Sequence, residues 1–89
     1  KLGKPGIMGE INMEDLIKKI LNDQIKDSLV TVEGGESKYT VQVISDIFKD
    51  KTIIDRHKII YAALDSYIKS GEIHALTIKS LTIDESNKV

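Results

Sequence analysis

Cysteine is absent from this chain of 89 residues. The fold therefore cannot depend on disulfide bonds, a zinc site made of cysteine thiolates is excluded, and no thiol nucleophile is present. This composition is compatible with a reducing compartment.

Long apolar runs and an excess of charge of one sign are also missing. The longest apolar runs fall far short of the roughly 20 residues that span a bilayer, so no membrane contact is expected. The 13 basic and 14 acidic residues give a formal net charge of -1, a balance that does not favour nucleic acid as a partner. We expect a cytoplasmic or nuclear protein, or a mitochondrial one if a transit peptide has been removed.

The common catalytic motifs are missing as well. The sequence contains no Gly-x-Ser-x-Gly, no His-Glu-x-x-His and no Gly-x-x-x-x-Gly-Lys-Ser/Thr pattern. Its acidic residues are spread along solvated faces. We therefore predict no catalytic residue and a protein that is not an enzyme.

The chain is long enough for one small domain. With 40% hydrophobic and 30% charged residues, it can form one compact core and no second one. The glycine-rich, basic start predicts a disordered tail or residues left from cloning at 1–11, followed by a domain at 12–83 and a frayed terminus at 84–89. We expect a monomer when the protein is alone.

The first half of the domain predicts a helix followed by a hairpin. Asn12 and Asp15 form a cap-like pair before an amphipathic segment at 13–25. β-Branched runs at 29–32 and 39–44 flank two glycines followed by Glu36 and Ser37, which predicts two strands joined by a short glycine loop. Apolar and polar residues alternate in the second strand, as in a sheet covered on one side only.

The second half predicts a long helix and a third strand. Thr52 and Asp55 resemble a capping pair ahead of a helix that ends near Gly71, and residues 73–78 read as a strand. Because a strand-helix-strand connection is nearly always right-handed, this strand should run parallel to the second. The order α-β-β-α-β predicts an α+β fold with a three-stranded mixed sheet and helices packed on one face.

The two histidines differ in their predicted setting. His57 falls in the middle of the apolar stripe of the long helix, so a buried histidine with one satisfied ring nitrogen is favoured over a metal ligand. His74 opens the third strand, where the apolar layer meets the edge of the sheet. The pattern alone favours a structural histidine there, since one imidazole makes no metal site.

Four basic side chains gather around the start of the long helix: Lys49, Lys51, Arg56 and Lys58. Arg56 lies at the rim of the apolar stripe, from which it could reach solvent, a partner or a phosphate. We predict that these cations form a partner-binding surface, with a solvated charged rim as the alternative.

The residues from Val43 to Leu81 resemble the BolA family. The matching motifs are a strand exit, a helix start and a strand: Val43-Ile44-Ser45-x-x-Phe48-x-x-Lys51, Arg56-His57 and Ile73-His74-Ala75. The predicted order of elements is also that of the family, whose fold is akin to the type II KH module. Asp50 departs from the pattern, because the family commonly has glycine there.

The resemblance implies an adaptor that pairs with a monothiol glutaredoxin and shares a [2Fe-2S] cluster with it, while glutathione and the glutaredoxin cysteine supply thiolates. The most consistent BolA-side ligand maps onto His74, which must be neutral to bind iron, so binding should weaken at acid pH. Lys38 stands where the family usually offers a second cysteine or histidine, and lysine is a poor cluster ligand. A water, Glu36 or His57 would then have to complete the coordination of the iron.

A KH-like protein that binds nucleic acid in transcription is the alternative function. KH modules clamp the nucleic-acid backbone with a Gly-x-x-Gly loop, which this sequence lacks, and the net charge of -1 gives little counterion release. The sequence therefore favours the adaptor.

Overall fold

The computed structural model describes residues 12–88, so the prediction made for residues 1–11 lies outside the described part. Its elements follow the predicted α-β-β-α-β order, with additional short helices, and they confirm the α+β fold class. In chain order they are α2 (Met13–Gln24), β1 (Leu29–Gly35), β2 (Lys38–Ile44), the 3-10 helix η1 (Asp46–Phe48), α3 (Ile53–Ala63), α4 (Asp65–Ser70), β3 (Ala75–Leu81) and α5 (Ile83–Asn87).

The starts of the two main helices confirm the capping pairs. The Asn12 side chain accepts a hydrogen bond from the backbone N–H of Asp15 at 2.8 Å. The Thr52 hydroxyl accepts one from the N–H of Asp55 at 3.1 Å. Each bond satisfies an N–H that has no partner within the first turn of its helix.

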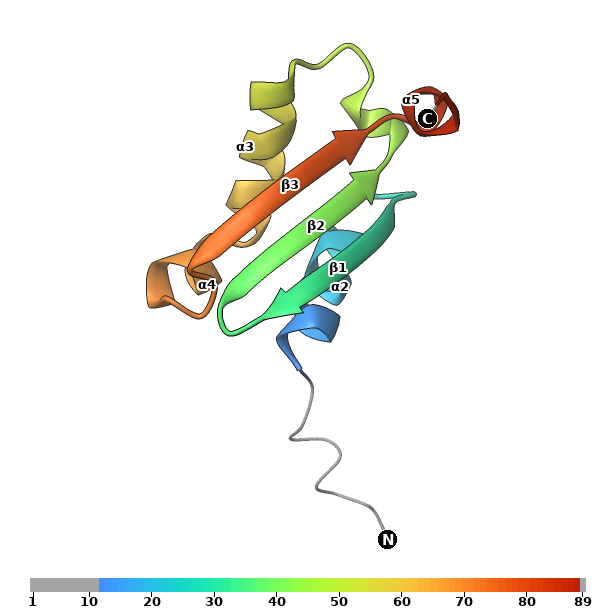
Figure 1. Cartoon of the computed structure of the whole chain (residues 1–89). Coiled ribbons are helices and arrows are strands. Elements are labelled where there is room, and N and C mark those ends of the chain that lie inside the picture. The colour runs from blue at the N-terminus through green and yellow to red at the C-terminus, as the bar shows by residue number, and fades with distance from the viewer. Residues whose placement is uncertain (1–11, 89) are drawn as a thin grey trace, which may run out of the picture.

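The sheet has the strand order β1-β2-β3. Strand β2 pairs antiparallel with β1 and parallel with β3, as predicted. Helices α2 and α3 both lie behind the sheet in Figure 1, so one face of the sheet is covered and the other is open.

The core lies between the helices and the covered face of the sheet. Along β2, Tyr39, Val41 and Val43 are buried while Thr40 is exposed, which confirms the alternation. The buried hydrophobic residues are Ile17, Leu21, Ile25, Val30, Tyr39, Val41, Val43, Phe48, Ile60, Leu64 and Ile73.

The long helix predicted up to Gly71 is wrong in one respect, since it is broken at Leu64. The backbone of Leu64 leaves the helical region, with φ -106° and ψ 11°, while its side chain is fully buried. The break changes the chain direction, so that α4 lies beside the start of β3 in Figure 1. Gly71, with φ 87°, ends α4 in the left-handed conformation that favours glycine.

The predicted frayed end from residue 84 is also wrong, because α5 is held by a capping box. The Thr82 hydroxyl accepts from the N–H of Glu85 at 3.1 Å, and the Glu85 carboxylate accepts from the N–H of Thr82 at 2.8 Å. The third strand also begins and ends later than the predicted 73–78. Its carboxyl end therefore connects directly to α5.

None of the helices in residues 12–88 has both the length and the apolar character needed to cross a membrane.

Candidate functional site at the hairpin and His74

The tip of the β1-β2 hairpin is a two-residue turn formed by Glu36 and Ser37. Both have positive φ, at 53° and 69° respectively, which is the backbone of a type I′ turn. Gly34 and Gly35 belong to β1, so the turn occupies only the second half of the predicted loop at 34–37. Gly34 is needed for a different reason: its φ is 134°, and a β-carbon there would overlap the carbonyl oxygen of Lys38.

The hairpin tip is joined to His74 through the backbone. The Ser37 carbonyl oxygen accepts hydrogen bonds from the N–H groups of His74, at 2.6 Å, and Ala75, at 3.0 Å. Ala75 is also the register partner of Lys38 across the parallel pair. The fold therefore brings His74 and Lys38, which are far apart in sequence, to one corner of the sheet.

The His74 side chain at this corner is exposed. His74 directly precedes β3, in a segment anchored by Ile73, whose side chain is 2% exposed. A buried anchor followed by a backbone bond to a tight turn fixes the chain on both sides of the imidazole. The exposed imidazole therefore projects from a backbone that is held in place on both sides.

The predicted basic surface is only partly present. Lys49, Lys51 and Lys58 are exposed, and none of the three makes an ion pair within residues 12–88. The prediction that Arg56 belongs to this surface is wrong, because the residue is only 5% exposed.

Arg56 is buried because every side of its guanidinium finds a partner. Its Nε donates to the Lys51 carbonyl at 3.0 Å and its Nη1 to the Ser80 carbonyl at 3.1 Å. Nη1 and Nη2 contact the two carboxylate oxygens of Glu85 at 2.7 and 3.3 Å. The guanidinium carbon lies 5.9 Å from the centre of the Phe48 ring. Arg56 therefore holds α3, β3 and α5 together and is not free to dock a partner.

The Arg56 end of the sheet is well separated from His74. Arg56 binds the backbone of Ser80, which lies at the carboxyl end of β3, whereas His74 precedes the amino end. Six extended residues span about 20 Å. His57, half-buried beside Arg56 on α3, belongs to the Arg56 end, so the fold does not bring the two histidines together.

Within the described part of the chain, no three histidine, cysteine, aspartate or glutamate side chains gather as a group able to hold a metal ion. His74 is thus not part of a multi-residue metal site within residues 12–88. The sequence did not point to the Ser37 carbonyl, because a backbone group leaves no signal in the pattern of side chains.

These features describe a small α+β module with one exposed histidine at a sheet corner. The family model for BolA-like proteins matches residues 12–85, and the chain belongs to the BolA family.

Relatives and solved structures agree with this family. An uncharacterised protein from the rpoN-murA intergenic region of Acinetobacter guillouiae is 37% identical over 78 residues, covering 88% of this chain and 93% of that protein. The structure of a BolA homologue from Coxiella burnetii has a TM-score of 0.74 at 32% identity, covering 86% of this chain and 97% of that one. The BolA domain of SufE1 from Arabidopsis thaliana has a TM-score of 0.75 at 28% identity, covering 84% and 98% respectively.

Proposed function

We propose that this protein is a non-catalytic adaptor that docks on a monothiol glutaredoxin and contributes the imidazole of His74 to a [2Fe-2S] cluster held between the two proteins. The observation that carries this proposal is the exposed His74, fixed beside the hairpin tip by the Ser37 carbonyl. Membership of the BolA family, which includes a domain of SufE1, is consistent with an iron-sulfur role.

The donor set of this chain fits one position on a cluster. A neutral imidazole is a good iron ligand, whereas Lys38, the register partner of Ala75 on β2, carries a side chain that is a poor cluster ligand. The remaining ligands would come from the glutaredoxin cysteine and glutathione. An imidazole in place of a thiolate makes a cluster less negative and raises its reduction potential.

The lysines at the start of α3 supply a separate contact in this proposal. Lys49, Lys51 and Lys58 are exposed cations without intramolecular ion pairs in residues 12–88, so they are available to an acidic partner surface. Because they surround the Arg56 end of the sheet, their effect on affinity can be measured separately from ligation by His74.

The test is a titration of a cluster-loaded monothiol glutaredoxin, with glutathione present, by this protein. Visible absorption and circular dichroism should show a saturable change with the wild-type chain. We expect His74→Ala to abolish that change, because the imidazole ligand is lost. His57→Ala is the matched control and should keep it, since His57 lies at the other end of the sheet.

A second variant set tests docking. Reversing the charge of Lys49, Lys51 and Lys58 to glutamate should weaken the affinity and its dependence on salt, without changing the spectrum at saturation. If His74→Ala gives the same spectral change as the wild type, the assigned ligand is wrong. If the protein binds DNA but no glutaredoxin, the KH-like alternative replaces the adaptor.

A further inference from the structure

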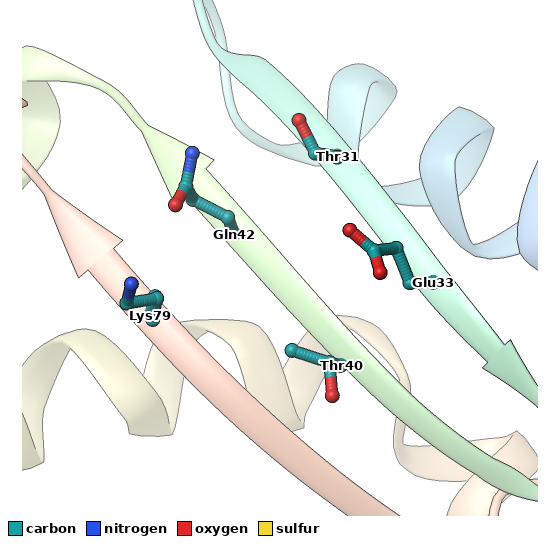
Figure 2. A pocket seen from close by; sticks show the side chains of 5 residues that line it. All are labelled: Thr31, Glu33, Thr40, Gln42 and Lys79. Atoms are coloured by element: carbon teal, nitrogen blue, oxygen red, sulfur yellow. The ribbon is translucent and has the colours of Figure 1, made fainter.

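Within residues 12–88, no helix packs on one face of the sheet (Figure 1). Five side chains of this open face are drawn in Figure 2, where they project from all three strands. They are Thr31 and Glu33 of β1, Thr40 and Gln42 of β2, and Lys79 of β3. Hydroxyl and amide groups therefore dominate the middle of the open face.

An apolar row crosses the open face at the carboxyl ends of β2 and β3. Leu29, Ile44 and Leu81 are register partners across the three strands, so their side chains lie next to one another. Leu29 is 70% exposed. A hollow of about 440 Å³ adjoins the row and is closed on one side by Ser86 of α5. Ile44 and Leu81 are half-buried, so Leu29 supplies most of the exposed apolar surface of the row.

Two charges of the open face lie on opposite edges of the sheet, and a third, Lys38, lies on the central strand. Glu33 is on β1, Lys79 is on β3, and β2 lies between them. Neither makes an ion pair within the described chain. Lys38 lies at the opposite end of the face from the apolar row, where its exposed side chain can extend into solvent.

We propose that the open face binds a second copy of this chain, with the two sheets packed face to face about a two-fold axis parallel to β2. This axis places β1 of one copy over β3 of the other. Residues that are register partners within one sheet therefore face each other across the interface. Leu29 then faces Leu81 of the second copy and Ile44 faces its own equivalent, so the apolar rows cover each other. Lys79 faces Thr31 of the second copy. Glu33 of that copy lies two residues further along the same strand.

The Glu33 and Lys79 charges support this axis over the other in-plane axis. The two Lys38 side chains face each other at the end of the interface away from the apolar row, where both can extend into solvent. Neighbours two residues apart on one face are about 7 Å apart, a distance that a lysine side chain spans. Each dimer therefore contains two Glu33–Lys79 contacts between copies. An axis perpendicular to the strands would instead place β1 on β1 and bring like charges to the same side, which costs free energy.

The size of the face sets the strength of the association. Three strands of seven residues cover about 14 × 23 Å. This area is well below the roughly 800 Å² per partner of stable complexes, so affinity should be weaker than about micromolar. The monomer expected from the sequence remains the prediction for dilute protein. This inference does not depend on the proposed cluster function, because His74 lies at the other end of the sheet.

The experiment is sedimentation velocity of the full chain from the micromolar to the millimolar range. The wild type should show a weight-average sedimentation coefficient that rises with concentration. Glu33→Lys alone and Lys79→Glu alone should each weaken association about tenfold, because both contacts of the dimer become repulsive. An equimolar mixture of the two variants should restore it, since both contacts of the mixed dimer are again attractive.

Far-ultraviolet circular dichroism checks that both charge variants remain folded. Leu29→Asp is a second test, of the apolar row, at a highly exposed position. The proposal is overturned if the wild type keeps a constant sedimentation coefficient into the millimolar range. It is equally overturned if the single charge variants associate like the wild type, or if their mixture associates no better than either alone.

Discussion

Arg56 and Glu85 form a bidentate ion pair between α3 and α5, with nitrogen-oxygen distances of 2.7 and 3.3 Å. The side chain of Arg56 is 6% exposed and that of Glu85 is 43% exposed. The pair ties the end of the chain to the body of the domain. It also restrains the wall of the hollow on the open face, because Ser86 follows Glu85 directly.

The first prediction concerns acid stability. The hydrogen bond from Arg56, followed by that from the Thr82 backbone, lowers the pKa of Glu85 from 4.5 to about 2. Since the folded pKa is depressed, this contribution to stability is complete above pH 4.5 and is lost as the pH falls toward 2. Thermal unfolding across this range should show a fall in Tm that is smaller in Glu85→Gln.

The control for that prediction is Asp84→Asn. Asp84 is an exposed carboxylate in the same turn and makes no ion pair within residues 12–88. Its variant should retain the wild-type dependence on pH. An identical slope for the wild type and Glu85→Gln would contradict a stabilising role for the pair.

The second prediction compares two buried serines. Ser80 Oγ is buried and has no hydrogen-bond partner within the described chain, whereas Ser45 Oγ donates to the Lys26 carbonyl at 3.2 Å and accepts from the N–H of Ile47 at 3.3 Å. Ser80→Ala should therefore leave the free energy of unfolding unchanged or raise it, while Ser45→Ala should lower it by about 1–2 kcal/mol. Urea unfolding measures both, and equal losses would contradict the assignment.

The third prediction concerns the two glycines before the hairpin turn. Gly34→Ala should reduce the free energy of unfolding by about 1–3 kcal/mol, because its φ of 134° and the nearby Lys38 carbonyl leave no room for a β-carbon. Gly35→Ala meets no atom within 4 Å and should be nearly neutral. Urea unfolding of the two variants provides the comparison, and a costly Gly35→Ala would show that the turn geometry is different.

The fourth prediction concerns Asp50, which occupies the position where the BolA pattern has glycine. Its φ of 64° lies in the left-handed region. Asp50→Gly should therefore stabilise the domain by relieving backbone strain, up to about 1 kcal/mol once the entropy of the added glycine is subtracted. Asp50→Ala retains the β-carbon and should be no more stable than the wild type. Thermal unfolding of both variants measures the difference.

The fifth prediction rests on the proposed function. Lys38→His would place a second imidazole at the corner that holds His74, since Lys38 and Ala75 are register partners. It should lengthen the lifetime of the shared cluster several-fold, measured as the decay of visible absorption after a chelator is added. Lys38→Ala removes the ammonium without adding a ligand. If both variants behave alike, the effect comes from charge and not from ligation.

Local features of the sequence predicted much of the fold. The Asn12 and Thr52 caps, the alternation along β2 and the parallel third strand depend on neighbours within a few residues or on the handedness of one connection. These constraints act before the core is assembled, so they can be read from a pattern.

Tertiary packing decided the rest. Arg56 has the spacing of a rim cation on α3, but partners 24 and 29 residues away draw it into the interior. The helix breaks at Leu64, whose side chain is fully buried in the core. His74 meets the hairpin through a backbone carbonyl, which any residue could provide. The sequence by itself therefore determined the order and faces of the elements, whereas only the assembled structure decided which charges are buried and which corner presents His74, because those contacts join segments that no local pattern connects.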